Sequence, residues 1–239
     1  MKKLVIIPTY NEIENIAAMI EKVFSLSIEF DLLILDDGSP DGTAAVVKSK
    51  ITEYKDRLFI VERSGKLGLG TAYLAGFKWG LERGYDLFFE MDCDFSHDPD
   101  DLVRLCNAAT QGADVVVGSR YVKGVNVVNW PMSRLLMSYF ASKYVRLVTR
   151  MKINDATAGF VCYSRKVLER INLDAVKMKG YGFQVEMKYT SWKLGFKIEE
   201  VSIIFTERQE GASKMSGGIF GEALFGVLAL PFRSIKGRK

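Results

Sequence analysis

The sequence is poor in the residues that build most thiolate metal centres and disulfides. Its 239 residues include three cysteines and one histidine. Cys93, Cys106 and Cys162 are widely spaced and form neither a metal-binding nor a redox motif. The cysteine count is odd, and a strand-like apolar segment, residues 4–7, stands where a secretory leader would be. These features predict a reducing compartment, and we expect the protein in the cytoplasm.

A hydrophobic run long enough to cross a membrane is also missing. The longest apolar run, residues 223–232, is well short of the roughly 20 residues that span a bilayer. We therefore expect contact with a membrane surface at most. The formal net charge of +4 is too small to indicate binding to nucleic acid.

The C-terminal end of the chain is basic. It carries Arg233, Lys236, Arg238 and Lys239 with no acidic residue among them. Such a tail binds anionic lipid in some proteins and only improves solubility in others. The sequence alone leaves both interpretations open.

Short apolar segments alternate with helical patterns along the first two-thirds of the chain. Strands are expected at residues 4–8, 32–35, 58–61, 87–91 and 115–117. Apolar residues between them recur at helical spacing, and Thr9 and Glu12 predict a capping box before the first helix. This alternation predicts an α/β fold with a Rossmann-like, mostly parallel central sheet flanked by helices.

The last third of the chain has a different pattern but contains no linker, so we expect one domain over residues 1–239. Strands are expected at residues 160–163 and 198–205, and helices at 133–149, 183–192 and 220–231. Two amphipathic segments, residues 133–150 and 219–232, are candidate membrane-interface helices. The alternative is that their apolar stripes belong to the core.

Four polar clusters follow predicted strands, at residues 8–12, 36–39, 92–94 and 118–121. Ligands of parallel α/β sheets bind at the carboxyl ends of the strands. Acidic side chains gathered there would repel one another without a bound cation or ligand. The clusters therefore predict a ligand site at this edge of the sheet.

Asp92 and Asp94 are the strongest metal candidates in these clusters. Alternate residues at a strand end project in different directions, so the two carboxylates would have different tasks. One can ligate a divalent cation, and the other can position ribose or water. Mg²⁺ and Mn²⁺ bind a few carboxylates together with phosphate oxygens.

Several motifs together resemble those of family 2 glycosyltransferases of GT-A fold. They read PTYNE, ILDDGSPDGT, MDCDFSHDP, VGSRY and ERQEGASK. Three further segments, residues 130–134, 182–186 and 208–214, resemble those of dolichol-phosphate mannose synthases and related polyprenyl-phosphate glycosyltransferases. The resemblance extends over nearly the whole chain.

This resemblance implies an inverting transfer of mannose from GDP-mannose to a polyprenyl phosphate of the dolichyl type, with Mg²⁺ or Mn²⁺. It also implies a peripheral enzyme on the cytoplasmic face of a membrane, with a small membrane subunit as a possible partner. The alternatives are the same chemistry with a different donor such as UDP-glucose or with a soluble acceptor, and a non-catalytic sugar- or lipid-binding module. A nucleotidyltransferase would need a basic, glycine-rich loop, which residues 8–12 are not.

The resemblance also assigns site residues. The nucleotide-sugar would be bound by Pro8, Tyr10, Glu12, Leu35, Asp37, Asp92, Cys93, Asp94, Arg120, Arg208 and Lys214. Asp94 would ligate the metal with help from Asp92. Ser96 stands where some archaeal relatives carry a glutamine ligand and is a third metal candidate, with a shorter side chain that would leave room for a bridging water. The acceptor phosphate would be bound by Arg120, Arg134 and Ser138, and Asp94, Arg120 and Arg134 would form the catalytic group.

A lipid phosphate is already anionic near neutral pH, so its attack on the sugar needs no general base. The metal would offset charge on the leaving diphosphate, and arginines would bring the two anions together. His97 is interpreted as a structural residue of the acidic loop rather than a base or ligand. Glu186 is either a structural anchor or an acid close to the acceptor.

Overall fold

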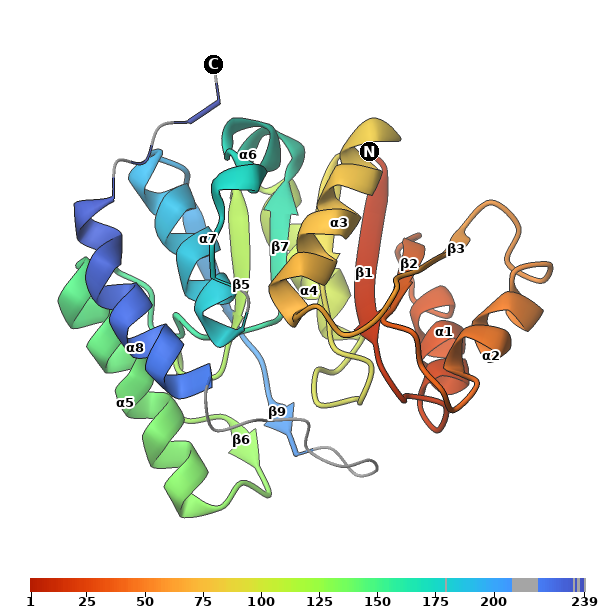
Figure 1. Ribbon diagram of the computed structural model, residues 1–239, viewed down its shortest axis with the longest axis horizontal. Helices are drawn as coiled ribbons and strands as arrows, with labels where there is room; N and C mark the ends of the chain where they lie inside the picture. Colours follow the sequence, from red (N-terminus) through yellow and green to blue (C-terminus); the bar gives the residue numbers. More distant parts are fainter. Residues whose placement is uncertain (179, 208–218, 234, 236, 239) are drawn as a thin grey trace.

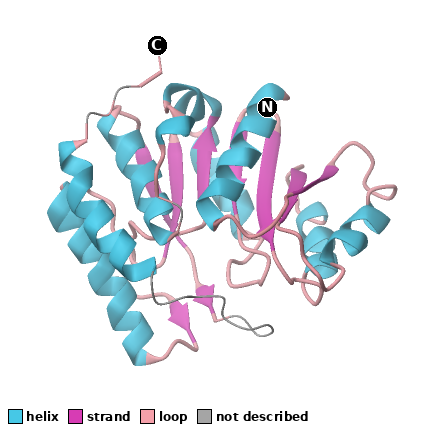
Figure 2. Ribbon diagram, viewed as in Figure 1, coloured by secondary structure: helices cyan, strands magenta, loops and turns pink. Residues whose placement is uncertain are grey.

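The computed structural model describes residues 1–178, 180–207, 219–233, 235, 237 and 238. The central sheet contains β1 (Lys3–Thr9), β2 (Asp31–Asp36), β3 (Leu58–Glu62), β4 (Leu87–Glu90), β5 (Val115–Ser119), β7 (Val161–Ser164) and β8 (Ile198–Ser202). Their order is β3-β2-β1-β4-β7-β5-β8. Helices cover both faces of this sheet (Figures 1 and 2). The predicted α/β architecture is confirmed.

The sheet is parallel except at β7, which runs antiparallel to both neighbours, β4 and β5. Strands β1, β2 and β4 are buried over most of their length, which agrees with their continuous apolar sequences. The strand at β7 was predicted, but its direction was not. The reversal divides the sheet into two parallel sets, β3-β2-β1-β4 and β5-β8.

Two buried clusters fill the two faces of the sheet. The first face is covered by α1 (Ile16–Phe24), α2 (Thr43–Lys50) and α4 (Asp101–Thr110). The second is covered by α3 (Leu69–Glu82), α6 (Arg165–Arg170), the 3-10 turn η1 (Leu173–Ala175) and α7 (Tyr181–Lys193). Each helix therefore places its apolar face on the sheet and leaves the strand ends open.

Helix α3 lies unusually close to the sheet because glycines face it. A methyl group added at Gly80 would lie 2.5 Å from a ring carbon of Phe88 and 2.7 Å from Leu4. At Gly76 the same addition would meet Ile6 at 2.8 Å. The absence of these side chains lets the helix backbone approach the strands.

Two local predictions were wrong. The capping box does not form, because the Thr9 hydroxyl donates to Asp36 Oδ1 at 2.9 Å and α1 begins at Ile16. The strand predicted for residues 198–205 ends at Ser202. The chain then bends, and β9 (Phe205–Thr206) pairs with β6 (Val127–Val128) in a separate two-stranded ladder. This ladder lies beyond the end of the main sheet (Figure 1).

The two amphipathic segments form α5 (Met132–Thr149) and α8 (Ile219–Ala229), and the latter continues into the 3-10 turn η2 (Leu230–Phe232). They lie side by side at one end of the molecule (Figure 1). Their inner faces pack with α7 in a third core cluster around Val145, Val185 and Val227. Their outer sides leave Phe140, Leu147, Leu224, Phe225 and Leu228 exposed. Among the residues that the structure describes, no helix is long and apolar enough to cross a membrane.

Candidate active site

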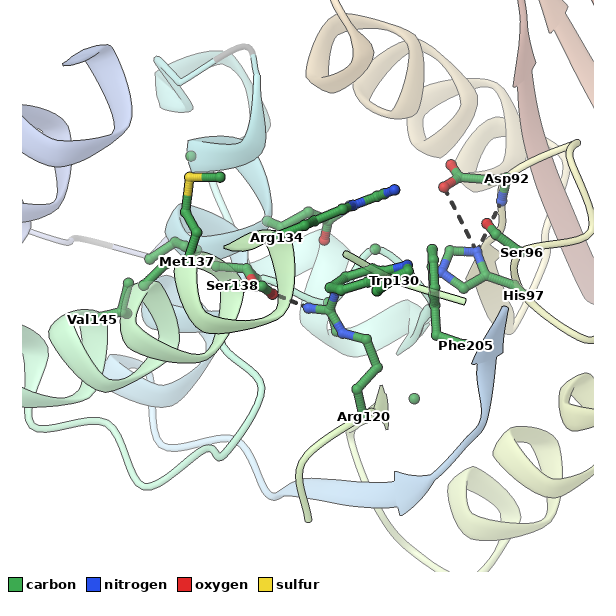
Figure 3. Close-up of a pocket in the computed structure, with 18 of the residues that line it drawn as sticks. Asp92, Ser96, His97, Arg120, Trp130, Arg134, Met137, Ser138, Val145 and Phe205 are labelled. Carbon is green, nitrogen blue, oxygen red and sulfur yellow. Dashed lines mark hydrogen bonds and ion pairs between the residues drawn. The ribbon is translucent and has the colours of Figure 1, made fainter. Parts of the chain in front are cut away.

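A pocket of about 560 Å³ opens at the carboxyl ends of β4 and β5. Asp92, Ser96 and His97 lie on one side of it (Figure 3). Met137 and Ser138 of α5 lie on the other side, with arginine and tryptophan side chains between. The apolar faces of α5 and α8 continue its wall through residues such as Phe140, Leu224 and Val227. One cavity therefore connects the acidic loop to the exposed apolar helices.

The acidic loop turns sharply directly after β4. Phe95 adopts a left-handed backbone with φ of 56°, which brings Ser96 back towards Asp94. Asp94 Oδ1 accepts hydrogen bonds from the Ser96 amide at 3.1 Å and the Ser96 hydroxyl at 2.6 Å. The Asp94 side chain is buried, whereas Asp92 is half-exposed. In the structure Ser96 therefore orients the Asp94 carboxylate.

His97 is buried beneath this loop. Its Nδ1 accepts a hydrogen bond from the Asp92 amide at 3.3 Å, and its ring stacks on Phe160 at 5.0 Å between centroids. Burial lowers the pKa of His97 to about 4, although Asp94 opposes the shift. The imidazole is therefore neutral at physiological pH. This geometry favours the structural interpretation of His97.

The structure pairs Arg120 with Asp155. Arg120 Nε and an η nitrogen each donate to the Asp155 carboxylate at 2.7 Å, and the guanidinium also donates to Thr157 at 3.0 Å. Burial would raise the pKa of Asp155, but Arg120 holds it below its usual value. Removing one partner of such a buried pair costs roughly 3–5 kcal/mol. Arg120 lines the pocket, and this pair fixes its position.

Arg134 has a looser partner. One of its η nitrogens donates to Glu207 Oε1 at 2.6 Å, and its guanidinium lies 4.3 Å from the Trp130 ring centroid. Both side chains of this pair are about one-third exposed. Exposed pairs are worth only about 0.2–1 kcal/mol. Ser138 also lines the pocket and accepts a hydrogen bond from Tyr121 at 2.9 Å.

The residues predicted for the nucleoside lie at the ends of β1 and β2. Asp37 forms an ion pair with Arg63 at 3.1 Å, and burial raises the pKa of Asp37 while Arg63 opposes the shift. The Lys66 ammonium lies 5.3 Å from the Tyr10 ring centroid. The Glu12 amide donates to Thr43 Oγ1 at 3.0 Å.

Two predicted site residues do not present an open side chain to this edge. The side chains of Leu35 and Cys93 pack in the two core clusters, so any contact with a nucleotide would come from their main chains. Pro8 lies within β1, opposite Leu35. Arg208 and Lys214 lie outside the described residues.

A buried charge cluster lies below the site. Burial raises the pKa of Glu90 to about 8 and lowers the pKa of Lys188 to about 8. Lys188 Nζ donates to the carbonyl oxygens of Ala158 at 2.7 Å and Gln184 at 3.1 Å. Gln184 and Lys188 lie beside Glu90 and oppose the rise in its pKa. Glu90 does not line the pocket, so it is not placed to take a proton from a substrate there.

Glu186 acts as an anchor in this structure. Its carboxylate accepts hydrogen bonds from the amides of Lys177 and Met178 at 3.0 and 2.8 Å, and from Arg233 at 2.7 Å. Arg233, predicted as part of a basic tail, is therefore engaged within the fold. The structural alternative for Glu186 is the one that the geometry favours.

Sequence reasoning missed the partners of the arginines. Asp155 and Glu207 lie 35 and 73 residues from Arg120 and Arg134, and no local pattern connects them. Arg63 could have been found, because it directly follows β3, as Asp37 follows β2. Glu90 was also detectable, as a single charge within an otherwise apolar strand.

The donor atoms at the acidic edge fit a hard divalent cation. Asp92 and Asp94 supply carboxylate oxygens, although no group of three or more His, Cys, Asp or Glu side chains that could hold a metal occurs in the described part of the chain, at this edge or elsewhere. Magnesium commonly uses one or two carboxylates and completes its shell with water and substrate phosphates. The site therefore suits a metal bound together with a diphosphate.

A mostly parallel sheet with an acidic loop after β4 and two arginines across the pocket is typical of a glycosyltransferase of GT-A fold. The chain belongs to glycosyl transferase family 2, whose model matches residues 4–172. It is 48% identical over 226 residues to the polyprenol monophosphomannose synthase of Mycolicibacterium smegmatis, covering 95% of this chain and 85% of that protein. It is also 48% identical over 227 residues to the undecaprenyl-phosphate mannosyltransferase of Micrococcus luteus, covering 95% and 93%.

Solved structures confirm the fold. The glucosyl-3-phosphoglycerate synthase of Mycobacterium tuberculosis in complex with phosphoglyceric acid matches with a TM-score of 0.69 at 17% identity, over 96% of this chain and 79% of that one. Its complex with Mn²⁺, uridine-diphosphate and glucosyl-3-phosphoglycerate gives 0.66 at 18% identity, over 97% and 78%.

Proposed function

We propose that this glycosyltransferase moves mannose from GDP-mannose to a polyprenyl phosphate, with inversion at the anomeric carbon. The observation that carries this proposal is the single pocket that joins Asp92 and Asp94 to the apolar wall of α5 and α8. A charged nucleotide-sugar fits its acidic, metal-binding side, and a lipid-linked acceptor fits its apolar side. The names of the two relatives at 48% identity support the same acceptor and sugar.

We propose Mg²⁺ or Mn²⁺ as the cofactor, held by Asp94 with Asp92 nearby. When bound, the cation offsets negative charge on the departing diphosphate. The hydrogen bonds from Ser96 fix the direction of the Asp94 carboxylate before substrate arrives. Such preorganisation is what electrostatic catalysis requires.

The described residues of the pocket suit a reaction without a general base. His97 is buried and neutral, with its Nδ1 occupied by the Asp92 amide, and Glu90 lies outside the cavity. A phosphomonoester has its second pKa near 6, so its oxygen is already a nucleophile at neutral pH. We propose that Arg134 and Ser138, which line the pocket, hold the acceptor phosphate, and that Arg120 presents its guanidinium to the same pocket from its fixed position.

The exposed side of α5 and α8 supports docking to the cytoplasmic face of a membrane. Phe225 is 71% exposed and Leu147 is 81% exposed, and both project from the same pair of helices. Amphipathic helices of this kind lie in the bilayer interface. A small membrane subunit could cover the same surface, which is the alternative occupant.

The test is to incubate the protein with Mg²⁺ or Mn²⁺, a polyprenyl phosphate and a panel of nucleotide-sugars that includes GDP-mannose and UDP-glucose. Glycolipid should form from GDP-mannose with inverted configuration, and chelation of the metal should abolish it. Asp94→Ala should lower the rate by at least about 100-fold, because the metal contributes several kcal/mol at the transition state.

Asp174→Asn, which alters an exposed ion pair far from the pocket, is the matched control and should keep full activity. Transfer from UDP-glucose alone would replace the donor in this proposal. Retained anomeric configuration, or full activity of Asp94→Ala, would refute the mechanism. Absence of any glycolipid would favour a binding module.

A further inference from the structure

We infer that Glu207 is an exchangeable counter-ion of the acceptor site, which weakens phosphate binding at Arg134 so that a phosphate needs the added apolar contacts of a lipid chain to bind. The Glu207 carboxylate occupies the Arg134 guanidinium until an acceptor phosphate displaces it. This inference rests on the proposed function, in which Arg134 binds that phosphate.

Arg134 is held on two sides. Glu207 Oε1 accepts from its guanidinium at 2.6 Å, and the Trp130 ring lies against its face at 4.3 Å. The Glu207 amide donates to Val128 O at 3.0 Å, which fixes the glutamate at the end of the β6–β9 ladder. Figure 3 shows Arg134 and Trp130 together between the acidic loop and α5. The Arg134 side chain therefore already points into the pocket, where it is paired with the Glu207 carboxylate.

Arg120 and Arg134 differ in how easily an incoming anion could displace their carboxylate partners. Asp155 is fully buried and contacts the Arg120 guanidinium at two points, so releasing it would leave a buried carboxylate without a counter-ion. Glu207 contacts Arg134 through one oxygen, and its side chain is about one-third exposed. Glu207 can rotate into water when displaced. Arg134 is therefore the arginine whose partner is exchanged.

Exchange of one anion for another adds little binding energy by itself. Free phosphate must compete with a carboxylate that is tethered beside Arg134 at high effective concentration. A prenyl phosphate brings additional energy, because its chain can be buried against apolar residues of α5 and α8 such as Phe140 and Val227. The carboxylate thus lowers the affinity for both phosphates by the same factor, and the lipid-linked phosphate alone has the apolar contacts that offset this loss.

The first experiment measures binding by titration calorimetry, without catalysis, to wild type and Glu207→Gln. The probes are inorganic phosphate and a water-soluble short-chain prenyl phosphate. The variant should bind both anions about two- to five-fold more tightly, the range expected for loss of an exposed ion-pair competitor. In assays the acceptor KM should fall by a similar factor while the GDP-mannose KM stays unchanged. Weaker or unchanged binding of both anions would overturn the inference.

The second experiment is a double-mutant cycle with Arg134→Gln. In that background Glu207→Gln should have no effect on anion binding. An equal effect in both backgrounds would indicate a general charge effect and overturn the inference. Glu199→Gln, which removes one charge from an exposed position on β8, is the matched control and should leave binding unchanged. Anion binding that behaves as expected without any glycolipid formation would refute the proposed function alone.

Discussion

Arg120 and Asp155 form a two-point ion pair in which the carboxylate is completely buried. The same carboxylate accepts the Arg120 amide at 3.0 Å, so one side chain fixes both the backbone and the guanidinium after β5. Glu200 accepts the Asp155 amide at 2.9 Å and links this pair to β8. The charge of Arg120 at the pocket is therefore built into the fold.

Asp155→Asn should destabilise the protein by about 3–5 kcal/mol, because it leaves the Arg120 charge buried without a counter-ion. Chemical denaturation with matched m-values is the measurement. Asp174→Asn removes an exposed partner of Lys78 and should leave the unfolding midpoint unchanged. Equal midpoints for Asp155→Asn and wild type would contradict the assignment of this pair as buried and essential.

The lowered pKa of His97 predicts that the folded protein loses stability in mild acid. Its folded pKa of about 4 is below the unfolded value of about 6.5, so between these values the unfolded chain binds a proton that the folded one does not. The free energy of unfolding should therefore fall as the pH drops from about 6.5 to 4, by at most about 1.4 kcal/mol per pH unit from this group.

Comparison with His97→Asn isolates this effect, because the carboxylates titrate in both proteins. The difference in unfolding free energy between variant and wild type should change steadily through that pH window and stay constant above pH 7. A constant difference at all pH values would mean that the fold does not shift the pKa of His97.

Phe225 and Leu228 should be required for binding of the protein to a membrane surface. Replacing both with Glu puts charges on the exposed side of α8 and should abolish co-sedimentation with anionic liposomes while leaving the circular dichroism spectrum unchanged. Ile13→Glu is the control, since Ile13 is an exposed apolar residue that shortly precedes α1 in the chain, and α1 lies at the opposite end of the molecule from α8 (Figure 1). If the double variant still sediments with liposomes, α8 does not dock.

Gly80→Ala should destabilise the fold although alanine is the better helix former. The added methyl would lie 2.5 Å from Phe88 and 2.7 Å from Leu4, and overpacking of this kind costs about 1–3 kcal/mol. The gain in helix propensity recovers up to about 1 kcal/mol. A thermal unfolding series with wild type tests this, and an increased Tm would show that α3 can shift away from the sheet.

The fold was readable from the sequence because strand and helix periodicities are local. Continuous apolar runs marked β1, β2 and β4, and the acidic residues after them identified the functional edge. The direction of β7 was not readable, because it depends on the path of the chain between β5 and β7, which follows no local pattern. The bend after Ser202 was missed for the same reason, since apolar residues continue through it.

The sequence predicted which residues form the site but not which side chains they contact. Asp94 and Arg134 were recognised from motifs that lie within a few residues of them. Their states depend on Ser96, Glu207 and Trp130, and the Glu207 contact forms only when β9 folds back beside β6. For Leu35 the motif identified the residue but not its orientation. Its position at a strand end did not indicate that the side chain points into the core.

The reversed strand β7 separates the sheet into two parallel blocks. The residues proposed for the nucleotide and metal belong to the block from β3 to β4, and Arg120 belongs to the block of β5 and β8. In the sequence the boundary between these blocks falls between α4 and β5, so a crossover between two homologous enzymes at residues 111–114 would keep Asp92 and Asp94 on one side and Arg120, Arg134 and Ser138 on the other. Chimeras joined there offer a way for donor and acceptor preferences to be recombined independently.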